Sequence, residues 1–206
     1  MFVEDYMSAH PVTIHENAPL SEAAETMRKR RFRQLPVVDR SERLVGIITD
    51  RDLRQTMAVG QPLEETLTVS DAMTAEPMTT TPDATLEEVI IALSTHRFGS
   101  LPVVRAGELV GIITYIDVLR AFSELLGLDV EGHRIEVALP GGYADVARAF
   151  DAIRHCDGQI VSSMVSRVRR DGGEPALYLR VAVGQGTSIE RRLRAAALVL
   201  LKPEHD

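Results

Sequence analysis

The first 125 residues carry one pattern of apolar and polar positions twice. Apolar residues at helical spacing are followed by two short, nearly continuous apolar stretches joined by a polar turn, and then by another amphipathic stretch. This pattern predicts an amphipathic helix, two strands covered on both faces or nearly so, and a final helix. The first helix of each copy is expected to bury Leu20, Ala23, Ala24 and Met27, or Leu86, Val89, Ile90 and Leu93.

The two copies are an internal repeat at a nearly constant offset. Leu35-Pro36-Val37-Val38 recurs 66 residues later as Leu101-Pro102-Val103-Val104. After a turn that is one residue shorter, Leu44-Val45-Gly46-Ile47-Ile48-Thr49 recurs 65 residues later as Leu109-Val110-Gly111-Ile112-Ile113-Thr114. One copy of about 60 residues buries too little surface to be robust alone. We therefore expect the two copies to pack sheet to sheet around a pseudo-two-fold axis.

Local signals place the ends of these elements. Thr85 followed by Glu88 is typical of a capping box at the start of the helix in the second copy, and Pro19 suits the opening turn of its counterpart. A short extended piece is expected before the first helix of each copy, over 12–14 and 78–80. The final helix of each copy is expected to begin at Thr49 or Thr114.

The pattern changes after residue 128. The sequence predicts strands over 133–139, 159–169, 176–183 and 198–201, helices over 145–155 and 189–197, and a hairpin loop over 170–174. The order strand, helix, strand, strand, helix, strand is the split βαβ pattern. We therefore expect an α/β (α+β) protein with two βαββα-type repeats at 1–66 and 67–126, a linker at 127–132, and a βαββαβ ferredoxin-like domain at 133–206.

Composition narrows the class of protein. Apolar residues make up 45% of the chain, enough to bury a core. The longest apolar run, Ala195 to Leu201, is far shorter than the roughly 20 residues of a membrane helix. The N-terminal MFVEDYMS lacks the basic region of a signal peptide, so a cytoplasmic protein without membrane contact is expected. Cys156 is the single cysteine, and the histidines show no paired ligand spacing, so we expect no disulfide and no metal site.

Charge argues against nucleic acid as a partner. The net charge is −7, and residues 1–125 hold 12 basic and 19 acidic side chains while 126–206 hold 11 of each. Nucleic-acid binding draws on neutralisation of phosphates by basic side chains, which neither part supplies in excess. A nucleic-acid-binding regulator is therefore kept only as an alternative.

The candidate chemistry lies in Gly-Ile-Ile-Thr-x-x-Asp, which ends at Asp52 in the first copy and at Asp117 in the second. A Thr at a strand-to-helix junction can cap the helix while its hydroxyl and the first free N–H groups face an anion. An Asp three residues later can accept both hydroxyls of a ribose. The same pair could also be a helix cap worth about 1 kcal/mol that needs no ligand. Its occurrence at the same point of both repeats favours the ligand interpretation.

On these residues and on the two Leu-Pro-Val-Val runs, residues 1 to about 125 resemble a tandem pair of cystathionine-β-synthase-type (CBS) domains, the adenosine-sensing Bateman module. The resemblance implies two composite clefts in which adenine lies between aliphatic side chains and is read by backbone groups. One cleft would use Ile112, Thr114 and Asp117 with Thr13, Ala18, Phe32 and Arg33; the other Ile47, Thr49 and Asp52 with Thr79, Ala84, Phe98 and Gly99.

The two copies differ in charge near these clefts. Five of the six residues from Arg28 to Arg33 are basic, against two between Ser94 and Gly99. We expect Arg33 to meet phosphates, although a basic run can also be a solvated helix end that complements the helix dipole. Arg51 lies inside the Thr-x-x-Asp of the first copy and joins the expected nucleotide-binding residues, whereas Ile116 replaces it in the second.

Residues 133 to 203 are similar to an ACT domain, with Leu139-Pro140-Gly141-Gly142 at the first strand-to-helix turn. Two Bateman repeats followed by such a module resemble the acetoin-utilisation regulator family. Both module types commonly pair with themselves, so the resemblance implies a homodimer. It also leaves an amino-acid sensor as an alternative function.

We therefore expect a non-enzymatic regulatory protein that needs no cofactor and binds AMP, ADP, ATP or S-adenosylmethionine between its repeats. Ligand binding would favour one relative orientation of the repeats and signal to an unidentified regulated protein. The alternatives are a nucleic-acid-binding regulator that uses residues 28–33 and an enzyme, for which the sequence offers no paired acid and base. His155 and Cys156 do not form a catalytic pair, since neighbours on a helix point about 100° apart.

Overall fold

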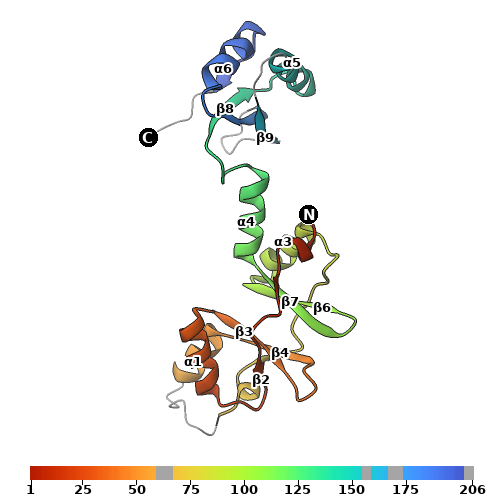
Figure 1. The fold of residues 1–206 in the computed structure, drawn as a ribbon, viewed down its shortest axis with the longest axis vertical. Helices are drawn as coiled ribbons and strands as arrows, with labels where there is room; N and C mark the ends of the chain where they lie inside the picture. Colours follow the sequence, from red (N-terminus) through yellow and green to blue (C-terminus); the bar gives the residue numbers. More distant parts are fainter. Residues whose placement is uncertain (59–66, 155–158, 167–173, 202–206) are drawn as a thin grey trace. The chain divides into compact units, whose positions relative to one another are not determined.

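The computed structural model describes residues 1–58, 67–154, 159–166 and 174–201. The chain divides into two compact units, Met1–Leu119 and Arg120–Asp206, and each has its own fold (Figure 1). Cys156 and most of the predicted hairpin loop lie outside the described residues. None of the helices within the described ranges has the length and apolar character needed to cross a bilayer.

The first repeat is a small sheet with helices packed on it. Strand β2 pairs with β3 in parallel, and β3 pairs with β4 in antiparallel orientation. The apolar residues predicted for the first helix, Ala24 aside, are buried against strand residues such as Leu35 and Ile48, while Ala24 is partly buried beside them. The elements are β2 (Ile14–His15), α1 (Leu20–Arg30), β3 (Gln34–Val38), β4 (Leu44–Thr49) and α2 (Asp50–Ala58).

The second repeat follows the same plan, with the counterpart of β2 reduced to a single bridge between Thr80 and Val103. The capping box at its first helix is confirmed, because the Thr85 N–H donates to Glu88 Oε2 (2.8 Å) and the Glu88 N–H donates to Thr85 Oγ1 (3.3 Å). The elements are α3 (Leu86–His96), β6 (Ser100–Arg105), β7 (Glu108–Thr114) and α4 (Tyr115–Leu125).

The two repeats exchange the segments that precede them. The 3-10 turn η1 (Val3–Asp5) and strand β1 (Ser8–Ala9) come before the first repeat but join the second, where β1 pairs with β7. The turn η2 (Val69–Asp71) and strand β5 (Thr74–Ala75) come before the second repeat but join the first, where β5 pairs with β4. The exchange interlocks the repeats within one unit, and it was not predicted.

Several strands and helices begin at other residues than the sequence predicted. The extended piece expected over 12–14 is a strand only at 14–15, because the chain before it crosses from the second repeat, where the His10 N–H donates to Val110 O (3.2 Å). The final helices begin at Asp50 and Tyr115, one residue after the threonines, which cap them.

The second unit has the order predicted for it and an antiparallel sheet in the order β11-β8-β10-β9. Helix α5 starts two residues earlier than predicted, because Gly142 takes a positive φ of 62° and forms its N-cap. Helix α6 starts earlier too, since the Gln185 carbonyl accepts from the Ile189 N–H without a side-chain cap. The elements are β8 (Gly132–Ala138), α5 (Tyr143–Ile153), β9 (Ile160–Ser166), β10 (Ala176–Ala182), α6 (Gly186–Ala195) and β11 (Leu200–Leu201).

Candidate functional site

Each Thr-x-x-Asp forms a closed set of hydrogen bonds at a strand-to-helix junction. At the start of α2, the Thr49 N–H and hydroxyl donate to Asp52 Oδ2 (2.8 and 2.7 Å), and the Asp52 N–H donates back to Thr49 Oγ1 (3.3 Å). At the start of α4, the corresponding distances between Thr114 and Asp117 are 2.9, 2.7 and 3.3 Å. The two repeats thus hold the same hydroxyl and carboxylate in the same geometry.

These bonds fix what each group can still offer to a ligand. Both bonds to Asp52 end on Oδ2, so its Oδ1 can accept from a ligand hydroxyl. The Thr49 hydroxyl has directed its proton at the carboxylate and faces a ligand as an acceptor. The bonds are those of a helix cap, so the capping role is real in both repeats. A ligand role would come in addition to it.

The exchanged segments carry the early threonines of the predicted clefts from one repeat to the other. Ser8 pairs with Ile112 on β7, and six residues later Ile14 pairs with Val37 on β3, so Thr13 lies on the stretch between the repeats. In the same way, the stretch from Thr74, which pairs with Ile47, runs to the second repeat and contains Thr79. Thr13 follows the strand that pairs with Ile112, and Thr79 follows the strand that pairs with Ile47.

The starts of β3 and β6 lie close together. A Cβ built at Gly99 would lie 3.1 Å from Gln34 Oε1, which places the residue before β6 against the first residue of β3. The carbonyls at these points hold the final helices, since Arg33 O accepts from the Asp50 N–H (2.9 Å) and Gly99 O from the Tyr115 N–H (3.2 Å). Arg33 and Gly99 therefore border the helix starts that carry the Thr and Asp pairs of their own repeats.

Two aromatic rings stand exposed at equivalent positions. Phe32 and Phe98 are each 43% exposed. Phe98 stacks on His96, with 5.3 Å between ring centroids and 16° between ring planes. Both rings can offer an apolar surface to a flat ligand.

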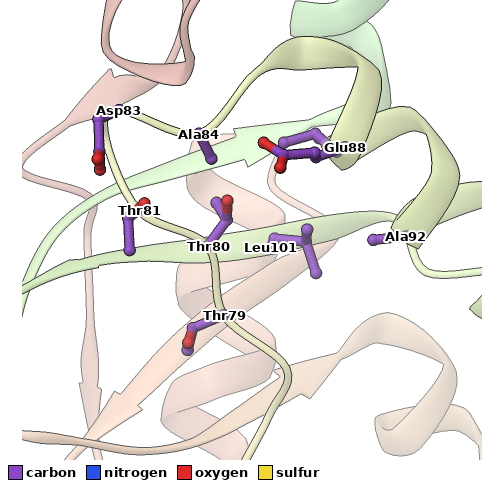
Figure 2. Close-up of a pocket in the computed structure, with 9 residues that line it drawn as sticks. Thr79, Thr80, Thr81, Asp83, Ala84, Glu88, Ala92 and Leu101 are labelled. Carbon is purple, nitrogen blue, oxygen red and sulfur yellow. The ribbon is translucent and has the colours of Figure 1, made fainter.

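A pocket of about 450 Å³ opens beside Thr79 (Figure 2). It lies between the segment before α3, the inner face of α3 and β6. Thr79 and Ala84, both predicted site residues, form part of its wall, whereas Thr49 and Asp52 are not among its lining residues. The lining residues are Thr79, Thr80, Thr81, Asp83, Ala84, Glu88, Val89, Ala92 and Leu101.

The basic run lies at the end of α1. Three of its residues form the last turn of the helix, where cations complement the dipole, and Lys29 pairs with Glu25 (2.7 Å). Arg31 ends the helix in the left-handed conformation, and Arg33 is exposed. Arg51 is exposed on the first turn of α2. Within the described residues, no group of three or more His, Cys, Asp and Glu side chains could hold a metal ion.

Sequence reasoning missed the polar residues at the strand starts and in the pocket. Gln34 and Ser100 both directly precede Leu-Pro, and the Ser100 hydroxyl is buried without a hydrogen-bond partner in the structure. The signal was a polar residue at the same point of both copies. Asp83 and Glu88 could have been found by comparing them with Asn17 and Glu22, which occupy the equivalent positions.

The structure resembles solved CBS-domain pairs. One is CBSX2 in complex with AMP, at 29% identity and a TM-score of 0.54, covering 63% of this chain and 98% of that one. Another is the CBS pair of MJ0100 in complex with 5′-methylthioadenosine and S-adenosyl-L-methionine, at 33% identity and a TM-score of 0.54, covering 59% and 99%. A third is a putative acetoin utilization protein from Vibrio cholerae, at 34% identity and a TM-score of 0.57, covering 63% and 95%.

The sequence leads to the same assignment. The chain spans between 23% and 43% of the length of the first curated relatives that it matches. The model of the CBS domain matches it twice, over residues 3–59 and 69–124, and these two matches cover more than half of the chain. The chain belongs to the CBS domain family.

Proposed function

We propose that this protein is a non-catalytic sensor that binds an adenosine-containing ligand in two clefts between its CBS repeats. The observation that carries the proposal is the twofold Thr and Asp geometry, together with the exchanged segments that bring Thr13 and Thr79 to the other repeat. Solved CBS pairs that bind AMP, 5′-methylthioadenosine and S-adenosylmethionine support this class of ligand.

Each predicted residue has a role in this account. Asp52 and Asp117 accept from ribose hydroxyls, and Thr49 and Thr114 stand at the positive ends of their helices, towards the 5′ substituent. Ile47 and Ile112 pack on the adenine, and the backbone around Ala18 and Ala84 reads its edge. Arg33 meets phosphate and Arg51 borders the cleft of Thr79, while Phe32, Phe98 and Gly99 complete the walls.

Ligand binding would act by shifting a population. A ligand that contacts the helix start of one repeat and the exchanged segment of the other binds best when both are in place, so it favours one arrangement of the repeats. We propose a cytoplasmic homodimer that passes this shift to a regulated protein and needs no cofactor.

We further propose domains at 1–66, 67–126 and 133–206 with a linker at 127–132, the last domain being an ACT-like module that reports the change or holds the dimer. The amino-acid-sensor alternative is disfavoured by one contact. The Asp145 carboxylate is buried and accepts from the Gly141 N–H (2.7 Å), so the chain's own side chain occupies the turn before α5. The acetoin-utilisation assignment rests on the neighbour from Vibrio cholerae.

The nucleic-acid alternative predicts retention on DNA or RNA that weakens steeply with salt. The basic run that it needs is a helix end with Lys29 already paired, in a protein of net charge −7. Absence of any mobility shift at low salt would remove it.

Titration calorimetry with AMP, ADP, ATP and S-adenosylmethionine tests the proposed function. We expect binding by the native protein and a loss of at least tenfold in affinity for one site in Asp52→Asn and for the other in Asp117→Asn. Asp39→Asn is the matched control, since Asp39 accepts from the N–H groups of Ser41 (2.8 Å) and Arg43 (3.0 Å) in the turn between β3 and β4 and is not a predicted cleft residue. Binding that survives both site changes would reject the assignment.

A further inference from the structure

The pocket beside Thr79 has an acidic wall. Asp83 and Glu88 both line it, and none of its nine lining residues is basic. Hydrogen bonds favour the ionised form of both carboxyls: one from the Thr81 side chain lowers the pKa of Asp83, which the charge of Arg105 also lowers, and one from the Thr85 N–H lowers the pKa of Glu88. Figure 2 shows the two carboxylates on either side of Ala84.

The equivalent positions of the first repeat carry more positive charge. Asn17 stands where the second repeat has Asp83, and Arg33 stands where it has Gly99. Both differences make the first repeat more positive than the second. Arg51 belongs to the predicted cleft of Thr79 and is exposed on α2; like Thr49 and Asp52, it is not among the residues that line the pocket.

A phosphate group would meet these two sites differently. Glu88 has Glu22 as its counterpart in the first repeat, so the two sites differ through Asp83, whose negative charge would weaken phosphate binding by about tenfold at the partial screening of a surface pocket. A neutral 5′ group escapes the repulsion, and a cationic one is attracted. Beside Arg33, a phosphate gains a planar donor that can bind two of its oxygens.

We infer that the two clefts divide adenosine ligands by charge: the cleft of Thr79 and Ala84 takes an adenosine ligand without phosphate, and the cleft of Thr13 and Arg33 takes a phosphorylated one. The inference rests on the proposed function, because it assumes that both clefts hold adenosine. It adds that two residues that differ between the repeats, Asp83 and Arg33, determine whether each cleft binds a phosphorylated ligand.

The test is a titration of the full chain followed through the backbone amide resonances of Ala84 and Ala18, which report the two clefts separately. The probes are adenosine, S-adenosylmethionine and AMP. We expect Ala84 to respond to adenosine and to S-adenosylmethionine at concentrations at least tenfold lower than to AMP, and Ala18 to respond to AMP first. A stronger response to S-adenosylmethionine than to adenosine would show attraction of the cation in addition to exclusion of phosphate.

The double variant Asp83→Asn with Gly99→Arg installs the residues of the first repeat in the second. The Gly99 Cβ would meet only the flexible end of Gln34, so the arginine can be accommodated. We expect the AMP concentration that saturates Ala84 to fall by at least tenfold. Glu87→Gln is the matched control, because Glu87 is exposed on α3 beside Glu88 but does not line the pocket.

Two results would overturn the inference and leave the proposed function intact: equal response of Ala84 to AMP and adenosine in the native protein, or a double variant that changes AMP binding no more than Glu87→Gln does. Silence of both alanines towards all three probes would instead reject the proposed function and, with it, the inference.

Discussion

The backbone N–H of Val3 donates a hydrogen bond to the carbonyl oxygen of Ala84, 2.9 Å away. Its counterpart is the Val69 N–H, which donates to the Ala18 carbonyl at the same distance. Both valines are fully buried, and both alanines are residues predicted to border a ligand cleft. The contacts that interlock the repeats therefore also form the edges of the proposed clefts.

Removing the two buried methyl groups of Val3 or of Val69 should destabilise the interlocked repeats. We expect Val3→Ala and Val69→Ala each to lower the free energy of unfolding of the first unit by about 2 kcal/mol, measured by denaturant titration. Val12→Ala is the control, since Val12 is 38% exposed on the crossing stretch. A Val3→Ala protein as stable as Val12→Ala would mean that the exchanged segment is not held in the second repeat.

The close approach of β1 to β7 depends on Gly111. A Cβ there would lie 2.5 Å from Met7 Sδ and 3.2 Å from the Ser8 carbonyl oxygen. We expect Gly111→Ala to cost about 1–3 kcal/mol through overpacking, and Met7→Ala in the same chain to recover part of that loss because it removes the nearest obstacle. Simple additivity of the two changes in a double-mutant cycle would contradict the contact.

Local signals predicted most elements, while the pairing between distant segments remained hidden. The capping box at Thr85 and the apolar strands around Leu35 and Leu101 follow from neighbouring residues, and the structure has them. The repeat that Val3 and Val69 join could not be predicted, because the residues around a single buried valine do not show which sheet its segment will pair with. The same holds for the approach of Gly99 to Gln34.

The Thr and Asp pairs show how much of the candidate site could be predicted from the sequence. Their spacing predicted a helix cap, and the distances at Thr49 and Asp52 have that geometry. A ligand role for Thr49, and for the residues grouped with it, stays a prediction. The charge of the pocket wall became visible only when the fold placed Asp83 and Glu88 on one cavity.

The turn before α5 should make the second unit sensitive to acid. The N–H of Gly141, followed by Arg148, lowers the pKa of Asp145 in the folded chain below its unfolded value. Its stabilising effect is therefore fully present above about pH 5 and is lost as the pH falls through the unfolded and then the folded pKa.

We expect Asp145→Asn to lower the Tm of the second unit at pH 7 and to flatten its dependence on pH between about 3 and 5. Asp151→Asn on the same helix serves for comparison, because that carboxylate is exposed and 3.7 Å from Arg154. Parallel pH profiles for the native protein and Asp145→Asn would show that the Gly141 contact does not persist in solution.

A bound ligand should stabilise the first unit by mass action. At a free AMP concentration about 100 times the Kd, the expected gain is about 2.7 kcal/mol. We expect the unfolding transition of the first unit to move up with AMP concentration, as measured by scanning calorimetry, while that of the second unit stays in place. If only the unfolding transition of the second unit moved, the ligand would bind the second unit, and the proposed site in the first unit would be contradicted.

The central claim is that one ligand touches both repeats at once, and amide chemical shifts during a titration with AMP test it most directly. The account predicts that the amides of Thr114 and Asp117 shift together with those of Thr13 and Ala18, with one common Kd. Shifts confined to residues of a single repeat, or unrelated Kd values for the two groups, would contradict it.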